Sequence, residues 1–258
     1  MTHLPFFKYQ ATGNDFILID NRDQIVQPSE QLAKKLCDRK FAIGSDGLIL
    51  IQNHPGYDFE MVFFNPDGSQ SLCGNGSRCA VTFAKKLGVI DQSCHFLAYD
   101  GGHEASILPS GEVRLKMNDV HSVRSTADGT FVDTGSPHLI VFSDDVDTLD
   151  VVGEGRKIRY NDTFKDKGVN VNFVRRQGAH DIIVRTYERG VENETLSCGT
   201  GVTASALASA MHELRSPITI TTKGGRLQVE FTADGDGFTN IYLIGPAEEV
   251  FEGTIRLD

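Results

Sequence analysis

The sequence has 258 residues, of which 40% are hydrophobic, and its formal net charge at pH 7 is −10. This length allows one large domain or two moderate ones with buried cores, and no stretch approaches the ~20 apolar residues that span a bilayer. The acidic balance, without a Lys/Arg cluster, argues against nucleic acid and anionic membranes as partners. The N-terminal residues show no signal-peptide pattern, so we expect a cytoplasmic protein whose partner is a small molecule.

Strands dominate the predicted elements, and helices are few. β-rich runs bounded by Gly, Asn, Asp or Pro predict strands, and a helix is expected at 29–39, where Ser29 can serve as N-cap. Two further helices are predicted directly after the two CGxG sequences; the second is rich in Ala and small residues, as in a helix buried on most sides. The predicted strands are 15–20, 47–52, 59–64, 112–117 and 227–231, and the two further helices are 77–88 and 202–214.

The second half of the chain repeats the first. "TGNDFILI" at 12–19 resembles "TGSPHLIV" at 134–141, and "SLCGNGSRCA" at 71–80 resembles "LSCGTGVTAS" at 196–205. Three other pairs of segments follow in the same order at nearly the same spacing, including Gly101-Gly102 before Gly224-Gly225. The repeating unit is therefore about 120 residues long and occurs twice.

Two tandem copies predict two pseudo-symmetric domains facing each other across a cleft. We expect an N-terminal half at 1–117, a C-terminal half at 118–247, and a final strand at 248–258 that returns to the first half. Each half should consist of strands enclosing one buried helix, with a cysteine at the N-terminus of that helix. Equivalent elements would then bring Cys73 and Cys198 to opposite walls of one site.

A cysteine at a helix N-terminus can act as an acid or a base. The helix dipole and the unpaired N–H groups stabilise a thiolate and can lower a thiol pKa from ~8.5 to ~3.5–7.5. The same amides, with glycines that allow close approach, form a site for a carboxylate or a phosphate. Two such ends could bind the carboxylate of an amino acid, so that one sulfur removes the α-proton and the other protonates the opposite face.

Other interpretations of the cysteines remain open. No metal site is expected, because the sequence lacks paired CxxC motifs or closely spaced histidines. The glycine-rich turns lack the GxxxxGK[ST] form of a phosphate loop, and a disulfide switch between the two cysteines is a further alternative. Cys37, Cys79 and Cys94 are expected to be small buried hydrophobic residues.

Five segments resemble the diaminopimelate epimerase family, cofactor-independent epimerases with two active-site cysteines. They are "ATGNDFILID", "FNPDGSQSLCGNGSRC", "TGSPHLIV", "GVNVNF" and "YERGVENETLSCGTG", and they span most of the chain. The resemblance implies an α/β (α+β) fold of two domains, each a β-barrel of mixed strands around a central helix, with the active site in the cleft between them. It also implies interconversion of LL- and meso-diaminopimelate in lysine and peptidoglycan precursor biosynthesis, with no cofactor and no metal, and it suggests a homodimer.

The resemblance also assigns roles to individual residues. It implies that Cys73 and Cys198 are the acid/base pair and that His138 and Glu188 adjust their pKa values. Substrate contacts are implied for Asn14, Asn65, Gly74, Asn75, Asn170, Glu188, Arg189, Gly199 and Thr200, with Gly74, Asn75, Gly199 and Thr200 at the α-carboxylate. Asn170 and Arg189 would recognise the distal amino-acid centre, where the planar fork of an arginine suits a carboxylate.

One departure bears on specificity. The family usually has "GNPH" where this chain has "TGSPH", so Ser136 stands in place of an asparagine. Two alternative functions stay open. One is a related two-cysteine racemase acting on proline, hydroxyproline or histidine, and the other is a non-catalytic anion-binding or redox-switch protein with the same fold.

Overall fold

The computed structural model describes residues 2–257, which divide into two compact units. Unit 1 comprises residues up to Leu115 together with the segment from Gly245 onward, and unit 2 comprises Lys116–Ile244. The fold mixes α and β structure and is dominated by strands, as predicted. No helix in the described part of the chain combines the length and apolar character needed to cross a membrane.

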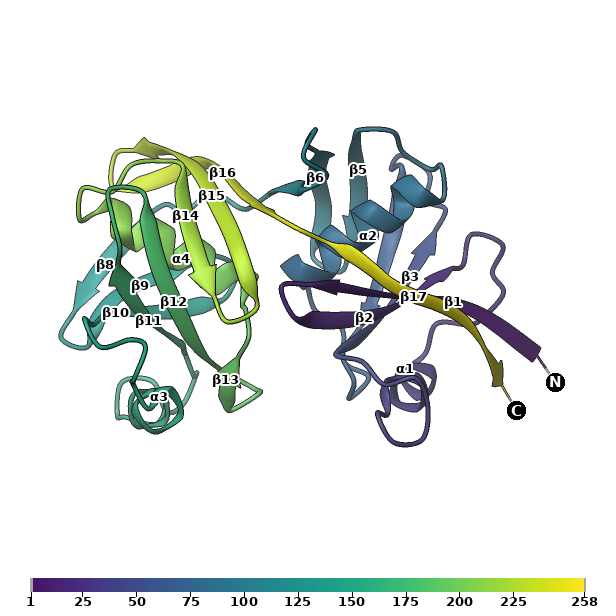
Figure 1. The fold of residues 1–258 in the computed structure, drawn as a ribbon, viewed down its shortest axis with the longest axis horizontal. Helices are drawn as coiled ribbons and strands as arrows, with labels where there is room; N and C mark the ends of the chain where they lie inside the picture. Colours follow the sequence, from purple (N-terminus) through teal and green to yellow (C-terminus); the bar gives the residue numbers. More distant parts are fainter. Residues whose placement is uncertain (1, 258) are drawn as a thin grey trace. The chain divides into compact units, whose positions relative to one another are not determined.

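In unit 1, strands surround the central helix α2 (Gly74–Lys86), which packs against β1, β2, β3, β4 and β6 (Figure 1). The long strand β17 pairs antiparallel with β1, so the end of the chain belongs to this unit. The strands are β1 (Thr2–Ala11), β2 (Asn14–Asp20), β3 (Gly47–Gln52), β4 (Phe59–Phe64), β5 (Ser93–Ala98), β6 (Gly101–Ile107), β7 (Val113–Lys116) and β17 (Glu248–Leu257).

Unit 2 encloses α4 (Gly199–Ala210) in the same way, against β9, β10, β11, β12, β14 and β15 (Figure 1). Nearly every residue of α4 is buried, which confirms the prediction from its small side chains. Thr203, Ser205 and Ser209 donate their hydroxyls to carbonyls one turn earlier, so the buried hydroxyls are satisfied. The strands are β8 (Val123–Thr126), β9 (Gly129–Asp133), β10 (Pro137–Phe142), β11 (Asn170–Arg176), β12 (Asp181–Glu188), β13 (Asn193–Thr195), β14 (Ile218–Thr222), β15 (Gly225–Asp234) and β16 (Gly237–Gly245).

The internal repeat is confirmed at the level of strand register. β2 pairs parallel with β3 through Phe16 and Gly47, and β10 pairs parallel with β11 through His138 and Asn170. The antiparallel pair β3–β4 is matched by β11–β12, and β5–β6 by β14–β15. Gly101 and Gly225 both open the second strand of a hairpin with positive φ, so Gly101 corresponds to Gly225, one residue later than the sequence alignment suggests.

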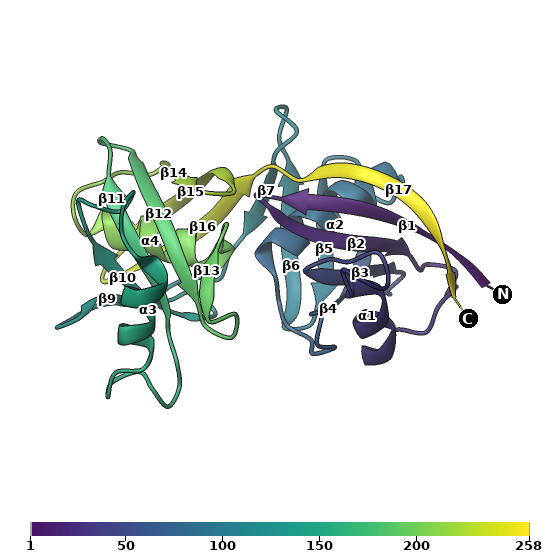
Figure 2. The same ribbon diagram turned by 60° about the horizontal axis from the view of Figure 1, so that its bottom comes forward.

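A smaller helix covers the outer side of the strands in each unit (Figure 2). In unit 1 this is α1 (Glu30–Cys37), which begins after Ser29 as predicted; Ser29 Oγ accepts a hydrogen bond from the Leu32 amide at 3.2 Å. In unit 2 it is α3 (Val151–Arg159), which we did not predict. Two glycines lower the helix propensity of α3. Gly155 is nevertheless required, because a Cβ there would lie only 2.4 Å from Tyr187 Cβ. The glycine allows α3 to pack closely on β12.

Alternation along the strands separates two buried layers in each unit. Ile17, Ile19, Leu48 and Leu50 belong to the core under α1, and Leu139, Val171 and Phe173 belong to the core under α3. The residues between them point toward the central helices, and several of these form the candidate site.

Candidate active site

Both central helices begin at a cysteine in the same conformation. Cys73 is the N-cap of α2 with φ −130° and ψ 110°, and Cys198 is the N-cap of α4 with φ −123° and ψ 114°. The helices therefore start three residues earlier than predicted, because the Gly-rich sequences form the first turns. The Cys73 and Cys198 carbonyls accept the first intrahelical hydrogen bonds, from Ser77 and Val202 at 2.7 and 2.9 Å.

The position suits an ionisable thiol and an anionic ligand. The Gly76 amide donates to Cys73 Sγ at 3.5 Å, so an orphan N–H of the first turn points at the sulfur. Neither helix has an acidic residue in its first turn, so the positive end of each helix dipole is not neutralised there. A carboxylate or a thiolate is favoured at such an end.

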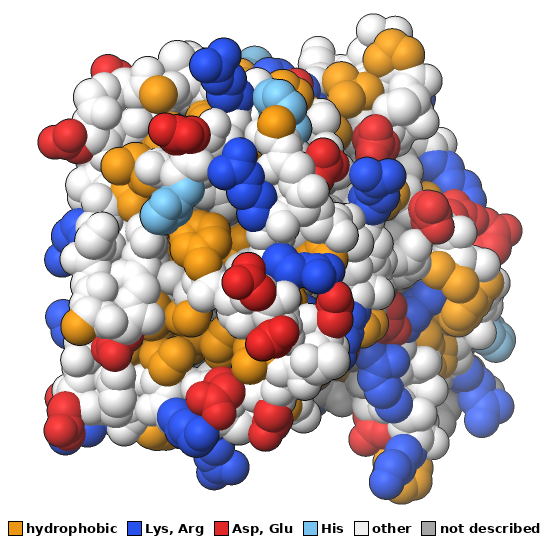
Figure 3. Space-filling view, turned by 60° about the vertical axis from the view of Figure 1, so that its left-hand side comes forward, with side chains coloured by type: hydrophobic (Ala, Val, Ile, Leu, Met, Phe, Trp, Pro, Cys, Tyr) orange, Lys and Arg blue, Asp and Glu red, His pale blue; other side chains and the backbone are white. Residues whose placement is uncertain are grey.

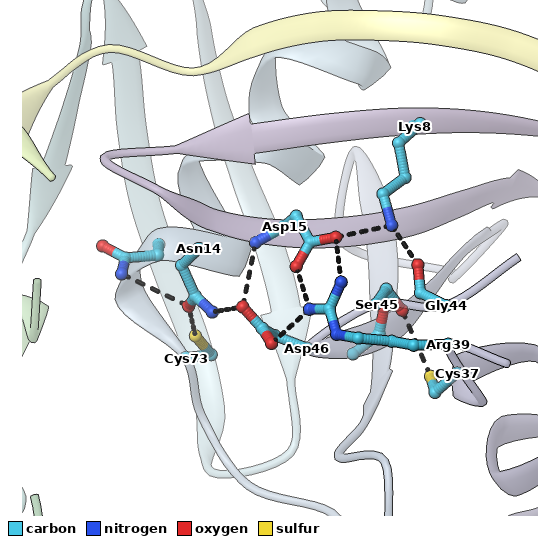
Figure 4. A network of polar contacts seen from close by, with 11 residues as sticks. Lys8, Asn14, Asp15, Cys37, Arg39, Gly44, Ser45, Asp46 and Cys73 are labelled. Carbon is cyan, nitrogen blue, oxygen red and sulfur yellow. Dashed lines mark hydrogen bonds and ion pairs between the residues drawn. The ribbon is translucent and has the colours of Figure 1, made fainter. Parts of the chain in front are cut away.

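In unit 1, three of the predicted residues meet at this point. Asn14 Oδ1 lies 3.7 Å from Cys73 Sγ and accepts a hydrogen bond from Asn75 Nδ2 at 3.3 Å (Figure 4). Asn14 Nδ2 donates to Asp46 Oδ2 at 2.7 Å, which fixes the carbonyl of the Asn14 amide toward the sulfur. As an acceptor, this oxygen favours the protonated form of Cys73.

An ionic cluster lies next to Asn14 and is bonded to its side chain through Asp46 (Figure 4). Arg39 bridges Asp15 and Asp46 at 2.5 and 2.7 Å, and Lys8 contacts Asp15 and the Gly44 carbonyl. Burial alone would raise the pKa of Asp15, but hydrogen bonds from Arg39 and Lys8 outweigh it and lower this pKa to about 2. Asp15 is therefore a carboxylate at neutral pH, and the cluster of Lys8, Arg39, Asp15 and Asp46 has two charges of each sign.

Asn65 contacts the segment that precedes Cys73 through hydrogen bonds of its side chain. It follows β4, and its Nδ2 donates to Ser69 Oγ and Ser71 Oγ at 3.0 and 3.1 Å. These bonds show that Asn65 stabilises its own turn, as asparagine often does in a Gly/Asp context. Asn65 corresponds in the internal repeat to Glu188 at the end of β12, because Phe64 lies opposite Leu48 as Tyr187 lies opposite Val171.

In unit 2, a chain of polar groups, buried except for Thr200, leads to Cys198. Thr200 Oγ1 lies 3.5 Å from Cys198 Sγ and 3.0 Å from His138 Nε2. On the other side of the ring, Asn172 Nδ2 is 3.1 Å from His138 Nδ1, and Thr186 donates to Asn172 Oδ1 at 2.9 Å. With Asn172 as donor, the His138 proton lies on Nε2 and points at Thr200, whose hydroxyl can donate to the sulfur.

His138 is neutral within this chain. The side chain is fully buried, and burial, with a smaller contribution from the positive charge of Arg189, lowers its pKa to about 3. The ring therefore acts at neutral pH as a hydrogen-bonding group, not as a cation.

The remaining predicted residues of unit 2 form a second group beside β10. Asn170 Oδ1 accepts from the Arg189 amide at 2.9 Å, and Asn170 Nδ2 donates to Ser136 Oγ at 3.0 Å. The guanidinium of Arg189 donates to the Lys167 carbonyl at 3.0 Å, and its stem passes over Gly168. Glu188 is half-buried, next to Arg189.

The other three cysteines are buried, as predicted. Burial raises the pKa of Cys37 and Cys79 and raises that of Cys94 to about 12, so all three remain thiols at neutral pH. They are packing residues.

Three residues that contact this region were not predicted from the sequence. Arg78 lies fully buried in α2, and Asn172 and Thr186 support His138. "VNVNF" alternates, which places Asn170 and Asn172 on the same face of β11; that was an available signal. Arg78 is a charged residue within a helix predicted to be buried, which was a second signal.

Comparisons with known proteins agree with one another. The family model described as diaminopimelate epimerase matches residues 6–123 and 130–250. A diaminopimelate epimerase of Flavobacterium psychrophilum is 50% identical over 256 residues, covering 98% of this chain and all of the relative. One from Aquifex aeolicus is 38% identical over 275 residues, covering 98% of each chain.

Solved structures share the fold at low sequence identity. A phenazine biosynthesis protein of the PhzF family from Bacillus anthracis is 14% identical with a TM-score of 0.77, covering 100% of both chains. A hydroxyproline epimerase from Agrobacterium vitis is 14% identical with a TM-score of 0.68, covering 99% of this chain and 93% of the other. The matched segments include both cysteine-capped helices, and the chain belongs to the diaminopimelate epimerase family.

Proposed function

We propose that this chain is an amino-acid epimerase that interconverts LL-2,6-diaminopimelate and meso-diaminopimelate in lysine and peptidoglycan precursor biosynthesis. Membership of the family supports the reaction and substrate. The observation that carries the mechanism is the pair of cysteines at equivalent helix N-termini, in nearly identical backbone conformations. The cytoplasmic location and the homodimer stay predictions.

The reaction needs a base on one face of the α-carbon and an acid on the other. In one direction, a thiolate takes the α-proton and becomes a thiol, and the electron pair left on carbon delocalises into the carboxylate. The second thiol then gives its proton to the opposite face and becomes the thiolate. Each turnover inverts the centre and exchanges the protonation states of Cys73 and Cys198. General acid–base transfer of this kind contributes roughly 10²–10⁴-fold.

The helix ends supply the electrostatic stabilisation. As the α-proton leaves, negative charge grows on the substrate carboxylate, and N–H groups aimed at it become more favourable in the transition state than in the ground state. We assign this role to the first-turn amides at Gly74, Asn75, Gly199 and Thr200. Excluding water would strengthen these interactions and raise the basicity of the thiolate.

Unit 2 carries the groups for the distal end of the substrate. Arg189, Asn170 and Glu188 stand at the ends of β11 and β12, where a second amino-acid centre would need a carboxylate partner and an ammonium partner. The Ser136 hydroxyl is held by Asn170, so it can take part in this contact in place of the usual asparagine. A diacid substrate explains why an arginine belongs there.

Acidic and basic side chains are interspersed on the face shown in Figure 3, with apolar atoms between them. That face offers no extended patch of one sign for a nucleic acid or an anionic membrane. Together with the net charge of −10, this favours a small-molecule substrate.

A substrate panel tests the proposal. LL-diaminopimelate, L-proline, trans-4-hydroxy-L-proline and L-histidine would be incubated with the purified chain in D₂O, and stereochemistry and deuterium incorporation would be followed. We expect inversion of diaminopimelate alone, with early product gaining deuterium while recovered substrate gains little. Activity on proline or histidine without activity on diaminopimelate would replace the proposed substrate, and equal early labelling of substrate and product would exclude the two-base mechanism.

A further inference from the structure

Arg78 is the largest fully buried side chain of the structure and the fifth residue of α2. Its guanidinium donates to Asn75 Oδ1 at 3.0 Å and to Thr12 Oγ1, the Gly74 carbonyl and the Pro246 carbonyl at 3.3–3.4 Å. All four acceptors are neutral. Two of them, on Gly74 and Asn75, belong to the two residues that directly follow Cys73.

The positive charge of Arg78 has no carboxylate partner among residues 2–257, although the other buried cation of this unit, Lys8, is paired with Asp15. A buried charge is strongly unfavourable unless an anion or a dense set of hydrogen bonds compensates it. Burial lowers the pKa of Arg78, but only to about 10, so the side chain is a cation at neutral pH.

Few groups around Arg78 could be the anion that compensates its positive charge. Cys79, the neighbour of Arg78 on α2, is kept protonated because burial raises its pKa, and Tyr9 on β1 is kept neutral for the same reason. The cluster behind Asn14 is balanced between two cations and two carboxylates. That cluster consists of Lys8 on β1, Asp15 on β2, and Arg39 and Asp46 in the segment between α1 and β3. On β17, Glu249 is bound by Lys86 and Tyr9, and Glu248 is bound by Gln10. This leaves the anions at the N-terminus of α2.

We propose that Arg78 is the buried counter-charge of the α2 N-terminus, favouring the thiolate of Cys73 and the carboxylate of the substrate bound beside it. The guanidinium also positions that end, because it holds Asn75 Oδ1 and the Gly74 carbonyl from within the unit. Arg78 does not touch the substrate; it is a positioning residue that acts through charge. The thiolate half of this inference stands by itself, and the carboxylate half rests on the proposed function.

The central helix of unit 2 has no charged residue at the equivalent position. The residue that corresponds to Arg78 in α4 is Thr203, whose hydroxyl donates to the Gly199 carbonyl at 2.9 Å. The counter-charge is thus specific to Cys73, and Cys198 serves as an internal control.

Alkylation by iodoacetamide measures the thiolate directly, without any substrate. The rate at Cys73 and at Cys198 would be followed by peptide mass spectrometry from pH 5 to 10, in the full-length wild type and in Arg78→Met and Arg78→Lys. Arg78→Met should slow Cys73 alkylation at pH 7 by about tenfold and shift its profile to higher pH, because an opposite charge has been removed. Arg78→Lys keeps the charge and should stay within about threefold of wild type, and Cys198 should change by less than about twofold in both.

Arg78→Gln, closer in polarity to arginine, repeats the test where the methionine variant does not fold, as judged by circular dichroism. An unchanged Cys73 profile in the folded neutral variant, or equal slowing in the lysine variant, would overturn the proposal. Diaminopimelate turnover is measured separately on the same samples. Absence of turnover in the wild type would reject the proposed function while leaving the alkylation result intact.

Discussion

The two helix N-termini have the same geometry and different chemistry. In unit 1, Gly76 is surrounded by Cys73, Phe16 and Ile49; in unit 2, the equivalent Gly201 is surrounded by Cys198, His138 and Asn172. In unit 1, the polar groups near the cysteine are a buried arginine and an ionic cluster. In unit 2, they form a neutral chain of hydrogen bonds. The two repeats share a helix that begins at a cysteine and differ in the groups around each sulfur.

This asymmetry matches what a two-base epimerase needs. In the proposed mechanism the two thiols exchange roles in every turnover, so neither can be fixed as acid or base. Around Cys73, the Asn14 carbonyl favours the thiol and Arg78 favours the thiolate. Around Cys198, the Thr200 hydroxyl can donate to a thiolate or accept from a thiol, since a hydroxyl does both.

Removing either sulfur should have the largest effect. Cys73→Ala and Cys198→Ala should each lower kcat/KM for diaminopimelate by at least ~10³-fold, and the double variant should be hardly worse than either single variant, because the two groups act as a unit. The measurement is a stopped assay of isomer ratio for all three proteins. Single variants with near-normal turnover, or effects that multiply, would show that the halves do not share one reaction.

The buried histidine of unit 2 predicts a loss of stability below pH ~6.5, and the equivalent position in unit 1 contributes none because Phe16 does not titrate. The folded-state pKa of His138, about 3, lies below its unfolded value. The stabilisation is therefore present above pH ~6.5 and is lost as the pH falls toward 3, because the unfolded chain binds a proton that the native chain cannot.

His138→Gln should remove this dependence. The free energy of unfolding of wild type minus that of the variant should fall by about 2 kcal/mol between pH 7 and pH 5. Urea unfolding followed by circular dichroism at each pH gives both values, and His180→Gln, an exposed histidine, is the control. Parallel pH profiles for wild type and His138→Gln would mean that His138 binds a proton as readily in the native state as in the unfolded chain.

The helices outside the strands offer a third comparison. α3 needs Gly155 against Tyr187, whereas no glycine occurs in α1. Gly155→Ala should lower the free energy of unfolding by about 1–3 kcal/mol through overpacking. Gly178→Ala is the matched control, because its Cβ would meet its nearest neighbour at an ordinary 3.6 Å. Equal stability of both variants would show that α3 can shift on β12.

The same glycines explain why α3 escaped prediction while its counterpart α1 did not. Local propensity opposes a helix at "VVGEGRKIR", and only packing on β12 makes it favourable. The repeat, the strands and both central helices could be read from the sequence because their patterns are local and occur twice. The ends of the helices differed by several residues, since glycines in the first turn hide the N-terminus.

The site was predictable only in part, for a related reason. The cysteines stand in a repeated motif, so their position at helix N-termini followed from the pattern. Arg78 and Asn172 matter through burial and through what they contact, and neither property is local. A buried charge is the exception to the usual exposure of arginine, and only the packed structure identifies it.

The smallest expected effect concerns the ionic cluster of unit 1. Asp46→Asn removes the charge that fixes the Asn14 amide, and the new side-chain amide can offer a donor where a carboxylate oxygen accepted from Asn14. Asn14 can then rotate and present its NH₂ group to Cys73, so kcat/KM should fall by about three- to tenfold. Asp20→Asn is the control, because Asp20 forms an ion pair with Arg22 but has no hydrogen bond to Asn14. Since a donor stabilises the thiolate, Asp46→Asn should also speed Cys73 alkylation at neutral pH, opposite to Arg78→Met. Unchanged or slowed Cys73 alkylation in Asp46→Asn would show that Asp46 does not fix the orientation of the Asn14 amide.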